Sequence, residues 1–202
     1  MRASLALAPL LTSSLREAGP PAPGAAPQGA TQQANEQDPA AEARAAVLRA
    51  MVVLKIAPYL KRDAGQAGDD KTPYRIAVVG DDATVAAIKR HLPGKEVGKR
   101  QVEIVALSEQ DATRPNRDRL FDAMFLAHDL DAKALASIVA AHEKLPTVLI
   151  SERAGFSRAG GSVQLFVEDN GLRFEVNQDA LKKQGVRASH QLLKLSRKGP
   201  EK

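Results

Sequence analysis

The stretch Thr147–Asn177, TVLISERAGFSRAGGSVQLFVEDNGLRFEVN, decides how this chain folds. It begins with three apolar β-formers at 148–150, a pattern typical of a buried strand. A glycine-rich loop follows, and two further strand-like segments, 163–167 and 172–176, flank Asp169-Asn170-Gly171. Asn-Gly between such segments is a strong hairpin signal, because a type I′ turn requires positive φ angles. The stretch therefore predicts a buried strand, a glycine loop and an antiparallel hairpin in succession.

Upstream of this stretch, strand-like and helix-like patterns alternate. Apolar runs predict strands at 74–79, 102–107 and 122–126, and segments without breakers predict helices at 39–59, 82–91 and 132–144. Strands that alternate with helices imply right-handed crossovers and a mostly parallel sheet. The predicted fold class is therefore α/β, with a mostly parallel sheet flanked by helices and an antiparallel hairpin at the sheet edge.

Short polar residues mark the predicted helix starts, and the segments between elements are polar. Residues 61–72 are predicted to be a loop, and 108–119 a charged loop or short helix. After the hairpin, a helix at 178–184 is expected to end at Gly185, with a final helix beyond it. The predicted N-caps are Asp81 or Asp82, Asp129 or Asp131, Asn177 and Ser189.

The helix at 39–59 has apolar residues on more than one face, including Val47, Leu48 and Met51. Such a helix is expected to lie largely buried against a sheet. An amphipathic helix at a membrane surface is the alternative. We favour burial, because the basic residues of this segment do not form a single polar stripe.

Composition divides the chain into three parts. Residues 1–40 are rich in Ala, Pro, Gly and Gln and are predicted to be a disordered tail. Residues 41–197 form the α/β domain, and 198–202 are a basic, frayed end. Met1-Arg2 and the apolar run from Ala3 to Leu11 are parts of a secretory signal peptide, although Pro9 interrupts the run. A plain disordered tail, or a wrongly assigned start codon, is the alternative.

Bulk composition narrows the class of partner. The 202 residues carry a net charge of +5, which favours an anionic partner such as nucleic acid or a membrane surface. Only 3% are aromatic and none is tryptophan, so platforms for base stacking are scarce and we expect no nucleic-acid partner. No stretch reaches the roughly 20 apolar residues that span a bilayer, so stable membrane insertion is not expected. The absence of cysteine excludes disulfides and thiolate metal sites.

No motif for catalysis, a metal or a cofactor is complete in this sequence. Gly80 ends a strand, but Asp81-Asp82-Ala83 follows in place of the further glycines of a dinucleotide fingerprint. His142-Glu143 lacks the second histidine of a zinc helix, and Ser151 lacks the flanking glycines of a nucleophile elbow. His128-Asp129-Leu130-Asp131 could bind a metal at a strand end, but the aspartates are better explained as helix caps. We expect neither an enzyme nor a cofactor.

The glycine loop is the candidate partner-binding surface. Gly155, Gly160 and Gly161 give its backbone conformations that other residues resist, and Phe156 lies between them. A large aromatic exposed on a loop can anchor a partner. The alternative is that Phe156 folds back and plugs the sheet edge. On the neighbouring strand, Arg173 and Glu175 alternate with apolar residues and are candidates for polar contacts with a partner.

Several motifs from this region follow one ordered pattern. They are Leu149-Ile150-Ser151-Glu152, Gly155-Phe156, Gly160-Gly161, Arg173-Phe174-Glu175-Val176-Asn177 and Leu192-Leu193. The pattern resembles the carboxy-terminal half of the YfiR family, with its HmsC relatives. Upstream, 54–59 and 76–81 resemble the first helix and first strand of that family. The resemblance covers about residues 45–197.

The resemblance implies a small periplasmic α/β protein, often a homodimer, without catalysis. Family members bind the periplasmic sensor domain of an inner-membrane diguanylate cyclase and hold it inactive, which controls exopolysaccharide and biofilm output. This sequence departs from the family pattern at Lys61-Arg62, where Trp-Pro is usual, and in lacking the cysteines of some members. A cytoplasmic location is the alternative, because the export signal is weak.

Two other functions remain open on the sequence alone. A small-molecule-binding module of the same fold would use the crevice at the carboxyl ends of the strands, near Gly80 and His128. The other is nucleic-acid binding through the basic carboxy-terminal helix, with Lys182, Lys183, Arg187, Lys194, Arg197 and Lys198.

Overall fold

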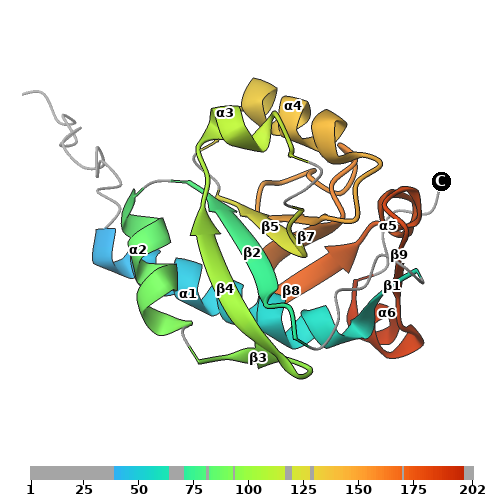
Figure 1. Cartoon of the computed structure of the whole chain (residues 1–202), viewed down its shortest axis with the longest axis horizontal. Helices are drawn as coiled ribbons and strands as arrows, with labels where there is room; N and C mark the ends of the chain where they lie inside the picture. Colours follow the sequence, from blue (N-terminus) through green and yellow to red (C-terminus); the bar gives the residue numbers. More distant parts are fainter. Residues whose placement is uncertain are drawn as a thin grey trace, which may run out of the picture. The chain divides into compact units, whose positions relative to one another are not determined.

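The computed structural model describes residues 39–63, 71–80, 82–92, 94–116, 120–127, 130–169 and 171–197. Within them, seven strands form one sheet in the order β3-β4-β2-β5-β6-β7-β8 (Figure 1). The strands are β2 (Tyr74–Val79), β3 (Glu96–Val97), β4 (Arg100–Ala106), β5 (Ala123–Leu126), β6 (Val148–Ser151), β7 (Val163–Glu168) and β8 (Gly171–Val176). Strands β4, β2, β5, β6 and β7 run parallel, which confirms the predicted α/β class.

The predicted hairpin forms the edge of this sheet. Strands β7 and β8 pair antiparallel, from Val163 opposite Val176 to Glu168 opposite Gly171. Asp169, in the turn, has a φ of 51°, the left-handed conformation that such a turn requires. Asn170 lies outside the described residues. The hairpin is therefore confirmed in place, with Gly171 as the first residue of β8 and not part of the turn.

Three short strands were not predicted. Strand β3 pairs with β4 at the other edge of the sheet. Strands β1 (Leu60–Arg62) and β9 (Val186–Ala188) pair antiparallel in a small separate sheet. The predicted loop at 61–72 is therefore wrong at its start. Two- and three-residue strands are too short to show a period-2 pattern, so only the pairing with a distant segment reveals them.

The helices follow the sequence pattern closely. They are α1 (Pro39–Ile56), α2 (Asp82–His91), α3 (Glu109–Ala112), α4 (Ala132–His142), α5 (Gln178–Lys183) and α6 (His190–Leu195), with a 3-10 turn η1 (Ala57–Tyr59) after α1. The caps Asp131, Asn177 and Ser189 each accept a hydrogen bond from the backbone N–H three residues on. Asp81 and Asp129 lie outside the described residues. Gly185, with a φ of 67°, ends α5 as expected.

Each face of the sheet has its own apolar core. On one face, Ile76 and Val78 of β2 belong to a cluster that includes Ala46, Ala50 and Val53 of α1. Helix α1 is thus a buried core helix, as predicted. On the other face, Ala77 and Val79 belong to a cluster that α3 and α4 cover. Strands buried on both faces are typical of a parallel sheet. No described helix combines the length and apolarity that crossing a membrane requires.

Candidate functional site: the glycine loop and the cavity beside His142

The glycine loop joins β6 to β7 and holds Phe156 inside the protein. The Phe156 ring is 1% exposed and packs in the cluster that contains Ala77 and Leu149. Gly161 makes room for it, since a Cβ at Gly161 would lie 2.2 Å from Cε1 of Phe156. Of the two alternatives that the sequence left open, the structure has the ring folded back on the sheet. Phe156 is therefore not an exposed anchor on the loop.

The other glycines of the loop serve its backbone path. Gly155 and Gly160 have φ angles of 79° and 97°, which side-chain-bearing residues rarely adopt. Backbone N–H groups inside the loop donate to backbone carbonyls, from Ala159 to Gly155 at 3.0 Å and from Gly161 to Phe156 at 2.9 Å. The loop is thus a tightly hydrogen-bonded turn. Gly160 lies next to α4, because a Cβ there would be 3.1 Å from Val139 Cγ1.

Ser157 joins the glycine loop to the hairpin. Its hydroxyl donates to Glu175 at 2.7 Å, and its backbone N–H donates to Gln164 Oε1 at 3.2 Å. Asn177 Nδ2 donates to the Ser157 carbonyl oxygen at 2.6 Å. The structure therefore brings the predicted loop and the predicted face of β8 together.

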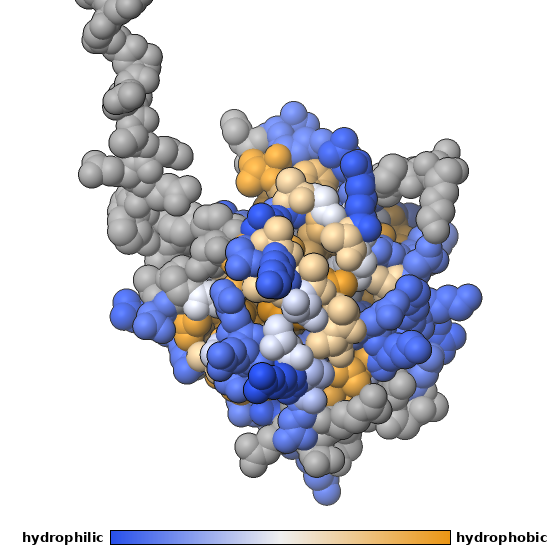
Figure 2. Space-filling view, turned by 90° about the horizontal axis from the view of Figure 1, so that it is seen from above, coloured by the Kyte–Doolittle hydropathy of each residue, from blue (hydrophilic) through white to orange (hydrophobic). Residues whose placement is uncertain are grey.

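The six predicted contact residues differ in accessibility. Gly155 and Arg173 are exposed, Gly160 and Glu175 are half-buried, and Phe156 and Gly161 are buried. Arg173 lies two residues from Glu175 and therefore on the same side of β8. Figure 2 looks onto the side of the molecule that bears α3 and α4, and shows a pale to orange apolar band between blue margins. The alanines Ala132, Ala136 and Ala140 on the outer side of α4 are exposed on this side.

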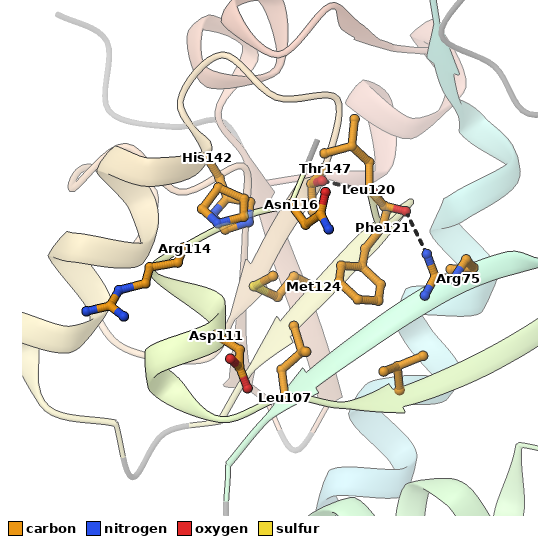
Figure 3. A pocket seen from close by; sticks show the side chains of 12 residues that line it. Arg75, Leu107, Asp111, Arg114, Asn116, Leu120, Phe121, Met124, His142 and Thr147 are labelled. Atoms are coloured by element: carbon orange, nitrogen blue, oxygen red, sulfur yellow. Dashed lines mark hydrogen bonds between the residues drawn. The ribbon is translucent and has the colours of Figure 1, made fainter. Parts of the chain in front are cut away.

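A cavity of about 240 Å³ lies on the same side of the sheet as α3 and α4 (Figure 3). Its lining comes from β2, β4, α3, β5, the end of α4, the segments that follow β4 and α3, and the segments before β5 and β6. It is formed by Arg75, Val105, Leu107, Asp111, Arg114, Pro115, Asn116, Leu120, Phe121, Met124, His142 and Thr147. Gly80 does not line it, and His128 lies outside the described residues. The cavity is therefore separate from the crevice that the sequence suggested for a small molecule.

His142 forms one wall of this cavity and is 2% exposed. Its Nδ1 lies 3.0 Å from the Ile138 carbonyl oxygen. A carbonyl oxygen only accepts, so Nδ1 carries the proton and Nε2 of the neutral ring is an acceptor. Burial lowers the pKa of His142 below its ordinary value of 6.5, against the opposing effect of the Ile138 hydrogen bond.

His142 predicts a loss of stability in mild acid. In the unfolded chain the imidazole regains its ordinary pKa of 6.5 and takes up a proton first as the pH falls. The stabilisation from a neutral buried ring is therefore complete above about pH 6.5 and declines below it. When the pH is lowered from 7.5 to 5.5, the urea concentration at the unfolding midpoint should decrease. The decrease should be smaller in the His142→Phe variant than in the wild type.

The exposed His91 supplies the matched control, because His91→Phe should leave the acid dependence of the wild type unchanged. Only the difference between the two pH values is compared, so a change in absolute stability of the His142→Phe variant does not affect the result. Equal acid slopes in the wild type and His142→Phe would contradict the assignment.

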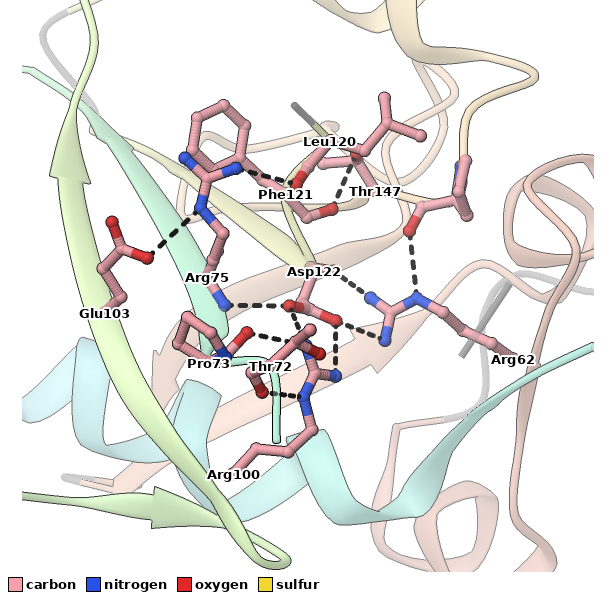
Figure 4. Close-up of polar contacts among 11 residues, drawn as sticks. Arg62, Thr72, Pro73, Arg75, Arg100, Glu103, Leu120, Phe121, Asp122 and Thr147 are labelled. Carbon is pink, nitrogen blue, oxygen red and sulfur yellow. Dashed lines mark hydrogen bonds and ion pairs between the residues drawn. The ribbon is translucent and has the colours of Figure 1, made fainter. Parts of the chain in front are cut away.

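Sequence reasoning missed a charged centre at the N-terminal end of β5. The Asp122 carboxylate accepts from both Nη atoms of Arg100 at 2.9 Å and from the Arg75 backbone N–H at 2.8 Å (Figure 4). Arg62 Nη1 lies 2.9 Å from the same carboxylate. Asp122 was predicted as the first residue of a strand, but the strand begins at Ala123. The only local signal was a charged residue adjoining a fully apolar strand.

The Asp122 centre holds the small sheet against the large one. Arg62 lies on β1, and its Nε donates to the Pro146 carbonyl oxygen at 3.1 Å. The guanidinium groups of Arg62 and Arg100 lie 5.9 and 5.2 Å from the centre of the Tyr74 ring. Burial raises the pKa of Tyr74 to about 12, so its hydroxyl stays protonated. These contacts indicate that the role of Asp122 and its arginines is structural. Arg62 belongs to the Lys61-Arg62 pair, where the sequence departs from the family pattern.

The described residues hold no cluster of three or more histidine, aspartate or glutamate side chains suited to a metal ion. The earlier candidate at His128-Asp129 falls outside them, while Asp131 caps α4. What the described site offers is therefore a hydrogen-bonded loop surface and a largely apolar cavity with one histidine, His142, in its wall.

Comparisons with known proteins agree with the fold and name a family. The crystal structure of a conserved domain protein from Vibrio cholerae O1 biovar eltor has a TM-score of 0.54 and 12% identity to this chain. The match covers 76% of this chain and 59% of that one, and at this identity it shows the fold alone. No functionally curated protein has significant similarity to this chain. The YfiR/HmsC-like family model matches residues 46–197, and the chain belongs to this family.

Proposed function

We propose that this protein is a non-catalytic regulator of the periplasm that binds the sensor domain of an inner-membrane diguanylate cyclase, or a similar sensor protein, and keeps it inactive. Exopolysaccharide and biofilm output would then depend on release of this inhibition. The observation that carries the proposal is the family match over residues 46–197, which extends from Ala46, buried in α1, to Arg197. A homodimer, as the resemblance implies, is part of the proposal.

The outer side of the glycine loop, with the adjoining face of β8, is the contact surface that we propose. Gly155 and Arg158 of the loop and Arg173 of β8 are exposed. Ser157 links loop and strand, so these groups keep a fixed arrangement. A rigid surface loses little conformational entropy on binding. Its arginines favour an acidic patch on the sensor domain.

Affinity capture from native membranes tests the proposal. A tagged wild-type protein should recover a membrane diguanylate cyclase or similar sensor protein, identified by mass spectrometry. The double variant Arg158→Glu/Arg173→Glu should recover at least about tenfold less, which corresponds to a loss of roughly 1.4 kcal/mol in binding. The control is Lys89→Glu, an exposed charge reversal on α2 at the opposite face of the sheet.

The possible results test the proposed function and the proposed contact surface separately. Recovery of only abundant, non-signalling membrane proteins by the wild type would overturn the proposed function. Equal recovery of the sensor by the double variant would leave the function standing and move the contact surface elsewhere. For location, an alkaline phosphatase fusion to residues 1–40 should be active, since this enzyme requires the oxidising periplasm.

A further inference from the structure

The cavity beside His142 has a polar group that the proposed function does not use. His142 Nδ1 is engaged with Ile138, while Nε2 has no hydrogen-bond partner among the described residues. In that same part of the chain, no side-chain nitrogen or oxygen is sealed from solvent without a partner. Nε2 therefore opens onto the cavity that its ring lines. Figure 3 shows the imidazole and the Met124 side chain facing the same space.

Thr147, Arg75 and Asp111, three other polar residues of the lining, already have partners. Thr147 Oγ1 donates to the Phe121 carbonyl oxygen at 2.9 Å. Arg75 lies 3.3 Å from Glu103 and 4.7 Å from the centre of the Phe121 ring. At the end of α3, Asp111 accepts from the Ser108 hydroxyl at 2.7 Å. Met124, His142 and Thr147 are the buried residues of the lining, and among them His142 Nε2 is the acceptor that has no partner within the described part of the chain.

Size and lining together define the ligand. A volume of about 240 Å³ is below the roughly 300–1,000 Å³ of pockets for drug-sized molecules, so a single ring with small substituents fits. Met124 and Phe121 favour an aromatic ring through sulfur–aromatic and ring contacts. A group that meets Nε2 must donate a hydrogen bond, because a carboxylate or carbonyl would bring its lone pairs against that of the ring.

We propose that this cavity binds a small neutral phenol, with the ring between Leu107, Phe121 and Met124 and the O–H donating to Nε2 of His142. An ammonium donor is disfavoured because it would lose its hydration, and because the two arginines of the lining, Arg75 and Arg114, outnumber its one carboxylate, Asp111. The site is separate from the glycine loop and from β8, so it stands or fails independently of the sensor partner.

Titration of the full chain with phenol, toluene and benzoate tests the site. Phenol should bind saturably and move the Nε2 nitrogen resonance of His142, with toluene at least about tenfold weaker because it cannot donate. Benzoate should not bind. In His142→Phe, phenol and toluene should bind about equally, and toluene binding there shows that the cavity persists. His190→Phe, at an exposed position, is the matched control and should behave like the wild type.

Three outcomes would overturn the phenol site. They are equal binding of phenol and toluene to the wild type, an Nε2 resonance that saturating phenol does not move, and no binding of phenol up to its solubility limit. The nitrogen resonance is read in the wild type, so the test holds even where the His142→Phe variant fails to fold.

Discussion

Asp122→Ala is expected to lower the free energy of unfolding by about 3–5 kcal/mol, the cost of removing one partner from a buried ion pair. The side chains of Asp122, Arg62 and Arg100 are 10%, 8% and 13% exposed. Without the carboxylate, two guanidinium groups remain largely out of water beside the Tyr74 ring, with no other carboxylate paired to them in the described part of the chain. The Arg75 backbone N–H also loses its acceptor.

Urea unfolding followed by circular dichroism measures the Asp122→Ala effect. The control is Glu103→Ala, because Glu103 is 47% exposed in its ion pair with Arg75, and such a pair contributes at most about 1 kcal/mol. In a double-mutant cycle, Arg100→Met should cost much less in the Asp122→Ala background than in the wild type. Backbone amides of β1 and β9 should also exchange faster, because Arg62 holds β1 to the main sheet. A loss under about 1 kcal/mol would contradict this account.

Phe156→Ala is expected to lower the free energy of unfolding by about 3–5 kcal/mol, the usual cost of removing a buried aromatic ring and leaving a cavity. Gly161→Ala should also be strongly destabilising, because the new Cβ would lie 2.2 Å from the Phe156 ring. Both effects arise from the contact between residue 161 and the Phe156 ring. Gly161→Ala should therefore lower the free energy of unfolding less in a Phe156→Leu background than in the wild type.

Gly155→Ala is the matched control for the loop. Its φ of 79° is unfavourable to alanine, but no atom lies within 4 Å of the new Cβ, so only the backbone cost of about 1–2 kcal/mol applies. Thermal and urea unfolding of these variants give the comparison. A Phe156→Ala variant that kept full stability but lost membrane capture would reverse the assignment and make the ring a partner anchor.

Much of the fold was readable from local sequence. The hairpin at Asp169–Gly171 follows from turn chemistry, and the caps Asn177 and Ser189 follow from hydrogen bonds that reach only three residues along the chain. The parallel sheet follows from the alternation of strands with helices. Each of these signals depends only on residues that are close together in the chain, so it can be recognised in a single sequence.

The sequence predicted only part of the candidate sites. The sequence picked the glycine loop and the polar face of β8, but left two positions open for the Phe156 ring. The space beside Gly161 selects the buried position, and that space exists only once β7 and the loop are packed. His142 looked like an incomplete zinc motif in the sequence. Its role as a cavity wall depends on β2, β4 and β5 lying opposite the end of α4.

By itself, then, the sequence determined the α/β class, the edge hairpin, the starts of the main helices and the family, because periodicity, turn chemistry and ordered motifs are local or additive along the chain. Only the tertiary structure decided which charges meet. Asp122 receives Arg62 from 60 residues away and Arg100 from 22, and no local pattern encodes either pairing. Such contacts form where crossover connections bring distant segments to one end of the sheet, and there desolvation makes each partner depend on the others.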